Sequence, residues 1–134
     1  MRNKIIAFIL VLILVNLGFP QNKISLLDTE KVNEYLELTP KQIKIINPKI
    51  EQIKTILEED KKIISEIKER VKNDDEPGFF EKIGVKRGHD KRASQIENLI
   101  DEIEDHLNDQ QKIEFKNIEK PELKPLKKEE IFGK

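Results

Sequence analysis

One long apolar stripe restricts what this chain can fold into more than any other feature of its sequence. Along the middle of the chain, aliphatic side chains recur at alternating steps of three and four: Ile43, Ile46, Ile50, Ile53, Leu57, Ile64, Ile67 and Val71. This heptad spacing is typical of coiled-coil packing. Asp60 interrupts the stripe at a seam position. We predict a helix over residues 40–72, kinked near residues 44–48 because Pro48 removes a backbone hydrogen bond.

The rest of the chain also favours an all-α fold. Over a third of the 134 residues are charged, and aromatic residues and glycines are few, as in long helices with a polar face. A second apolar face predicts a helix from about Lys91, with Ile96, Leu99, Ile100, Ile103 and Leu107. Residues 73–90 are rich in turn formers and are predicted to connect the helices, with at most a single helical turn. TEKVNEYLE, residues 29–37, predicts a short helix capped by Asp28 or Thr29.

Charge indicates how the two long helices pair. Residues 41–72 hold nine basic and six acidic side chains, whereas residues 95–109 hold six acidic ones and no Lys or Arg. This complementarity favours antiparallel pairing, within one chain or between two. Two helices with one stripe each cannot build a deep core without disulfides, and the chain has no Cys. We therefore predict an antiparallel, coiled-coil-like helical hairpin that forms a homodimer.

Two helix-start signals share one outline. In LTPKQ, Thr39 is the predicted N-cap, Pro40 takes the first helical position, and Gln42 reaches back to the cap. Leu38 precedes the cap and can pack against Ile43. In LNDQQ, Leu107, Asn108 and Gln111 repeat the arrangement with Asn as the cap. We interpret all six of these motif residues as starting two helices rather than as a ligand site.

The residues at the N-terminus have the pattern of an export signal. Two basic residues precede an unbroken apolar run, residues 5–15, which is the layout of a secretory signal peptide. We predict a signal peptide over residues 1–21, a helical domain over 22–118 and a flexible tail over 119–134. The protein is therefore expected to be exported. The junction lacks a clear cleavage site, so the alternative is an uncleaved anchor that holds the protein to the inner membrane through residues 5–19.

Composition also limits the function. The chain has no Cys, only two His and no glycine-rich phosphate loop, so it offers no nucleophile with its base and no cofactor fingerprint. We predict that it is not an enzyme and has no cofactor. Removal of residues 1–21 would leave a net charge of about −3, which argues against a nucleic-acid partner.

Two groups of residues carry alternative binding hypotheses. Glu102, His106 and Asp109 fall at i, i+4 and i+7, and one helix would present them together as metal ligands. The competing interpretation is a solvated acidic face. Phe79 and Phe80 lie side by side in a polar connector, where they either plug the end of the hairpin or form an exposed contact for a partner.

The paired motifs resemble those of a known family. Leu38, Thr39 and Gln42 match the motif LTxxQ, and Leu107, Asn108 and Gln111 match it with Asn in place of Thr. Over residues 34–118 the chain is similar to the LTxxQ family of periplasmic helical proteins, which are Spy-, CpxP- or ZraP-like. The resemblance implies hairpins that pair into a curved dimer and bind unfolded polypeptides or a sensor domain without ATP. The chain departs from the chaperone members in its acidic second helix.

Three alternative functions are therefore compatible with the sequence. The first is an ATP-independent, chaperone-like or envelope-stress binding protein of the periplasm, with itself and an unfolded polypeptide or sensor-protein domain as partners. The second is a metal-responsive periplasmic protein that binds zinc or copper. The third is a structural coiled coil, which would contact a membrane only if its N-terminus is uncleaved.

Overall fold

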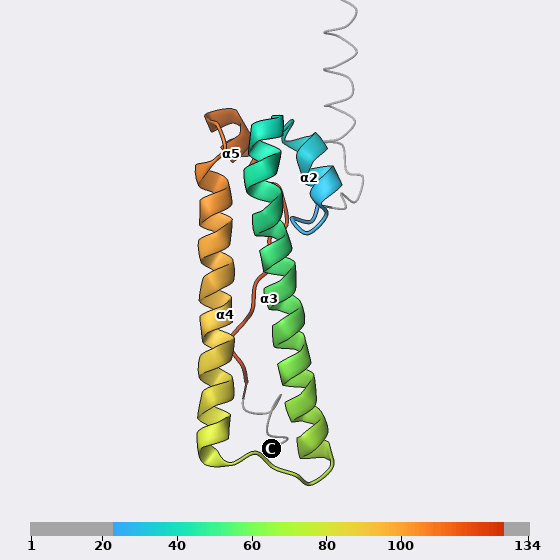
Figure 1. Ribbon diagram of the computed structural model, residues 1–134, viewed down its shortest axis with the longest axis vertical. Coiled ribbons are helices and arrows are strands. Elements are labelled where there is room, and N and C mark those ends of the chain that lie inside the picture. The colour runs from blue at the N-terminus through green and yellow to red at the C-terminus, as the bar shows by residue number, and fades with distance from the viewer. Residues whose placement is uncertain (1–22, 128–134) are drawn as a thin grey trace, which may run out of the picture.

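The computed structural model describes residues 23–127, which form four α-helices. These are α2 (Thr29–Tyr35), α3 (Pro40–Lys72), α4 (Phe79–Asp105) and α5 (Asp109–Phe115). The long helices α3 and α4 lie antiparallel, and α2 and α5 pack at one end of the pair (Figure 1). The predicted all-α helical hairpin is confirmed. The predicted signal peptide lies outside the described residues.

Helix α3 has the predicted limits. It begins after Thr39 and ends at Lys72, and it runs as one continuous helix through Pro48. The helix therefore does not break at Pro48, and the bend expected there stays a prediction. Helix α2 begins after Asp28, whose carboxylate accepts a hydrogen bond of 3.3 Å from the backbone N–H of Lys31. Asp28 is thus the cap of the short helix.

Helix α4 begins earlier than its sequence indicates. The prediction placed its start near Lys91, but the helix starts at Phe79 and only residues 73–78 connect it to α3. Gly84 and Gly88 misled the prediction, since a glycine inside a helix costs about 1 kcal/mol relative to alanine. Tertiary contacts override this cost: the buried His89 contacts α3. A Cβ at Gly88 would lie 3.1 Å from Nη1 of Arg92, so the glycine leaves room for that guanidinium group.

The core combines the hairpin with both ends of the described chain. The buried side chains of the core cluster are Leu26, Val32, Leu36, Leu38, Ile46, Ile50, Ile53, Ile96, Ile103, Leu107, Phe115 and Ile118. Four of them precede α3 and three follow α4, and the half-buried Leu123 packs against the same cluster. The chain therefore covers with its own segments much of the apolar stripe that we expected a second copy to cover. The homodimer stays a prediction.

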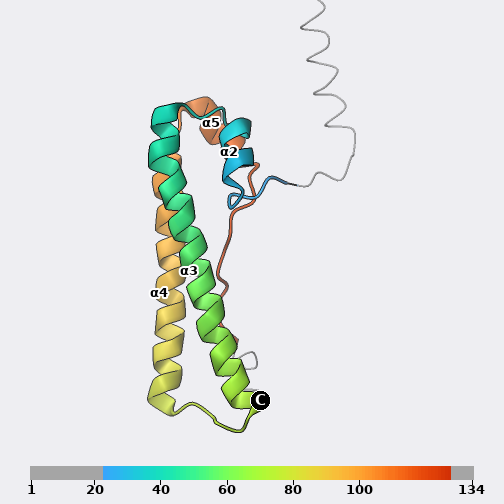
Figure 2. The same cartoon turned by 45° about the vertical axis from the view of Figure 1, so that its right-hand side comes forward.

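The segment after α5 is extended and packed against the hairpin. Glu119 donates its N–H to the carbonyl of Ile24 at 2.8 Å and accepts from the N–H of Leu26 at 2.9 Å. Lys120 donates to the carbonyls of Phe115 and Ile118, and burial lowers the pKa of its ammonium group. Residues 119–127, predicted to belong to a flexible tail, then run beside the long helices on the side of α2 (Figure 2).

Candidate functional site

The two motifs form the helix starts predicted for them. The hydroxyl of Thr39 accepts from the N–H of Gln42 at 3.2 Å, and Oε1 of Gln42 accepts from the N–H of Thr39 at 3.0 Å. Asn108 and Gln111 make the same reciprocal pair at 2.8 and 2.9 Å. Both are complete capping boxes, in which each side chain satisfies an N–H at the helix start.

The two capping boxes also bind each other, which the sequence did not indicate. Nε2 of Gln42 donates to Oε1 of Gln111 at 2.8 Å, and Nε2 of Gln111 donates to Oε1 of Gln42 at 3.1 Å. Their remaining donor capacity goes to the carbonyls of His106 and Leu36, at 2.8 and 3.0 Å. Each amide thus caps its own helix and joins it to the other motif.

The two motifs lie at a mostly buried contact between the starts of α3 and α5. Leu38 and Leu107 are buried in the core cluster, and Gln111 is only 5% exposed. Both glutamine side chains have protein partners at their oxygen and their nitrogen. This end of the hairpin holds the starts of α3 and α5 together and presents no vacant polar group of either glutamine to a ligand.

A buried charged cluster occupies the seam position of Asp60. This residue is 4% exposed, and its Oδ1 lies 2.8 Å from Nδ1 of His89 and accepts a hydrogen bond of 2.8 Å from Nε of Arg92. A buried carboxylate needs such partners, because an unpaired charge is costly to remove from water. The sequence signal was the acid inside an apolar stripe, but its partners lay in the supposed connector and its border.

His89 extends this cluster to the tail. Its Nε2 lies 2.7 Å from the backbone carbonyl oxygen of Lys124. A carbonyl oxygen can only accept, so Nε2 carries a hydrogen and donates it. One buried imidazole therefore contacts α3 through Asp60 and the tail through Lys124, and links three segments that are distant in the sequence.

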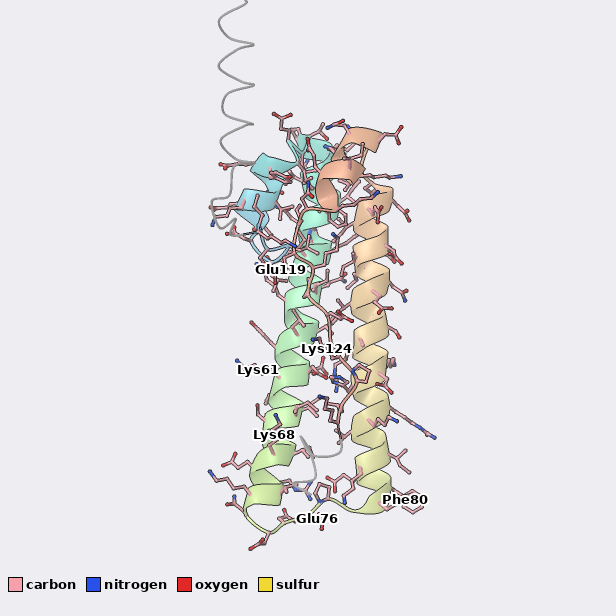
Figure 3. All side chains as sticks on the ribbon, turned by 180° about the vertical axis from the view of Figure 1, so that it is seen from behind. Lys61, Lys68, Glu76, Phe80, Glu119 and Lys124 are labelled. Atoms are coloured by element: carbon pink, nitrogen blue, oxygen red, sulfur yellow. The ribbon has the colours of Figure 1, made fainter. Side chains whose placement is uncertain are left out.

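Phe79 and Phe80 lie on the surface at the first two positions of α4. Their side chains are 72% and 84% exposed, and Figure 3 shows Phe80 pointing away from the helix pair. The rings contact each other edge to face, with centroids 5.6 Å apart. The interpretation that they plug the end of the hairpin is wrong, because both rings face solvent.

Ion pairs order the chain around these two rings. Arg70, in the last turn of α3, donates to both Glu81 in the first turn of α4 and Asp75 in the connector. Hydrogen bonding from Arg70 lowers the pKa of the Glu81 carboxyl. Lys82 and Glu76 form a further pair at 2.8 Å. Ion pairs thus hold the helix start that carries the rings against the end of α3.

The three metal-ligand candidates do not form a cluster. Their spacing required one continuous helix, but α4 ends at Asp105, and Asp109 begins the separate helix α5. Glu102 instead forms an ion pair of 2.8 Å with Lys49 of α3, which matches the predicted charge complementarity. Between residues 23 and 127, no three His, Cys, Asp or Glu side chains are grouped so that they could hold a metal ion.

A shallow groove of about 730 Å³ lies between α3 and α4. Its lining is mainly polar and acidic and includes Glu51, Glu59 and Glu102, with Ile56 and Leu99 as its aliphatic side chains. The apolar residues in this lining are Pro48, Ile56 and Leu99, whereas both phenyl rings are largely exposed.

The comparisons with known proteins neither support nor contradict the family resemblance. No protein-family model, curated protein sequence or solved structure matches the chain. None of the helices described here is long and apolar enough to cross a membrane.

Proposed function

We propose that this protein is an exported, ATP-independent binding protein of the periplasm that holds unfolded polypeptides, as the resemblance to the LTxxQ family implies. The observation that carries this proposal is the exposed ring pair, Phe79 and Phe80. In the described residues, most large apolar side chains are buried or half-buried, and these two are the most exposed of the four that are not.

The ring pair has the properties of a binding contact. A contiguous apolar patch on the surface is a liability unless it meets a partner, and phenyl rings bring a large contact area with few rotatable bonds. The ties from Arg70 to Asp75 and Glu81 position the helix start that carries the rings. A partner would therefore meet a surface that is already ordered, which lowers the entropy cost of binding.

The expected affinity suits transient holding. Full burial of one phenylalanine side chain contributes about 1.5–3 kcal/mol. Two rings would thus contribute roughly 3–6 kcal/mol before the cost of association is subtracted. Contacts of this size are exchanged readily, so an unfolded chain with several apolar segments could be held without ATP and released again. A folded sensor domain with one apolar pocket is the alternative partner.

Suppression of aggregation tests the proposal. The full chain, at a near-stoichiometric amount, is expected to reduce light scattering from an aggregating client, and a variant with Phe79→Ser and Phe80→Ser is expected to lose this effect. Because both rings are exposed, the variant should keep the wild-type melting temperature.

Ile113→Ser provides a matched control, since this apolar residue is 59% exposed but lies on α5 at the other end of the hairpin. The control variant should suppress aggregation as the wild type does. No suppression by the wild type, or full suppression by the double variant, would reject the proposal. The proposed export is checked by mass measurement of the protein recovered from the periplasm, which should lack about the first 21 residues.

A further inference from the structure

The tail occupies a groove of the hairpin as an extended peptide. Glu119 is fixed by its two backbone hydrogen bonds to the segment before α2. Farther along, Leu123 packs against the core cluster and Lys124 lies between the long helices (Figure 3). Pro121 and Pro125 have no N–H, which favours an extended backbone. The hairpin therefore already holds one extended segment in this groove.

The hold on this segment is slight and depends little on its sequence. Within the described part of the chain, residues 121–127 make one hydrogen bond to the other segments. In it, His89 donates to the backbone carbonyl of Lys124. Every residue of any polypeptide has such a carbonyl. The side-chain contribution is apolar contact by Leu123, Leu126 and Pro121, all of which are only partly buried. Another extended segment could supply both contacts.

An open pocket lies beside the tail. A cavity of about 510 Å³ lies between the tail and α3, lined by Ile64, Ser65 and Lys68 on the helix. Glu122, Leu123 and Leu126 line it from the tail. This pocket is open to solvent, so an incoming segment could reach the edge of the tail there.

We propose that residues 121–127 form a displaceable strap and that the groove beneath them is a second docking site for an extended segment of an unfolded polypeptide. The incoming segment would place an apolar side chain where Leu123 packs and a carbonyl at Nε2 of His89. An acidic residue before the apolar one suits the site, because Lys68 lines the cavity together with Glu122. This inference rests on the proposed function, but it concerns a site distinct from the ring pair.

A labelled peptide with the sequence of residues 119–127, EKPELKPLK, tests the proposal by fluorescence anisotropy. In the full-length wild type the tethered strap competes with the peptide at an effective concentration on the order of millimolar. Leu123→Asp should release the strap, and the peptide should then bind about tenfold more tightly. A peptide with Asp in place of the leucine that corresponds to Leu123 should not bind. Equal binding by the wild type and the Leu123→Asp variant would overturn the proposal.

A second variant locks the strap instead of releasing it. Ser65 and Leu126 line the same cavity, and the chain has no Cys of its own, so Ser65→Cys with Leu126→Cys is the pair designed to form one intramolecular disulfide, and mass measurement under non-reducing conditions verifies that it has formed. The oxidised form should lose peptide binding, and reduction should restore it. Binding that survives oxidation would overturn the proposal even if the Leu123→Asp variant fails to fold.

The outcomes separate this inference from the proposed function. The variant with serine at both ring positions should bind the peptide as the wild type does, because residues 79 and 80 lie at the tip of the hairpin. Peptide binding without any suppression of aggregation would retain the groove and reject the proposed function. Suppression of aggregation without peptide binding to the Leu123→Asp variant would retain the proposed function and reject the groove as a docking site.

Discussion

The contact between the two capping boxes can be measured with a double-mutant cycle on Gln42 and Gln111. Gln111→Ala removes four hydrogen bonds and leaves the carbonyl of Leu36 without its donor. At about 1 kcal/mol net for each bond, the expected loss of unfolding free energy is roughly 3–4 kcal/mol. Gln42→Ala removes a comparable set on a more exposed residue, so we expect about 2–3 kcal/mol.

The coupling between the two residues is the decisive quantity. Two of the hydrogen bonds join Gln42 directly to Gln111 and are lost in either single variant. The double variant should therefore lose about 1–2 kcal/mol less than the two single losses added together. Urea unfolding followed by circular dichroism gives each free energy, with an unchanged dependence on denaturant expected for all variants.

Gln110→Ala is the matched control for this cycle. Gln110 lies next to Gln111 on α5, but it is exposed, and within residues 23–127 its side chain makes only a long contact of 3.4 Å with Glu114. Its replacement should change the unfolding free energy by less than about 0.5 kcal/mol. Additive losses for Gln42 and Gln111, within about 0.5 kcal/mol, would refute the reasoning that the boxes act as one joint.

Four further predictions follow from the fold. Asp60→Ala should cost about 3–5 kcal/mol in urea unfolding, because it leaves Arg92 buried without its carboxylate partner; a loss below about 1 kcal/mol would contradict the buried ion pair. Thr39→Ala should cost about 1 kcal/mol as the loss of an N-cap, and an unchanged melting temperature would mean that Thr39 is not a cap. The lowered pKa of Glu81 means that its ionised form stabilises the fold above the ordinary carboxyl pKa of about 4.3 and that this contribution is lost as the pH falls below it; the stability difference between wild type and Glu81→Gln should shrink over that range. Light scattering at micromolar concentration should give the mass of a dimer, and a well-folded monomer would contradict the predicted homodimer.

The sequence predicted those elements whose signals are local. A capping box lies within four residues, and its chemistry does not depend on the remainder of the fold. Thr39 with Gln42 and Asn108 with Gln111 therefore matched the structure closely. The heptad stripe likewise depends only on spacing along one helix, which is why both limits of α3 were predicted correctly.

The misjudged parts depend on contacts between distant residues. The start of α4 was missed because Gly84 and Gly88 weaken a helix locally, whereas the contacts of His89 with Asp60 and with the tail support it across the fold. A buried acid in an apolar stripe indicates that a partner must exist but not which residue it is. The packing of the tail was not predicted because two prolines and no helical period also describe a segment with no fixed partner.

The claim that the protein binds unfolded polypeptides through its exposed rings is tested most directly by calorimetry. A permanently unfolded, reduced and alkylated protein is titrated into the full chain and into its Phe79→Ser, Phe80→Ser variant. The wild type should bind, and the variant should bind at least about a hundredfold more weakly, since each buried ring contributes about 1.5 kcal/mol or more. Equal affinity of the two proteins, or no binding by the wild type, would contradict the claim.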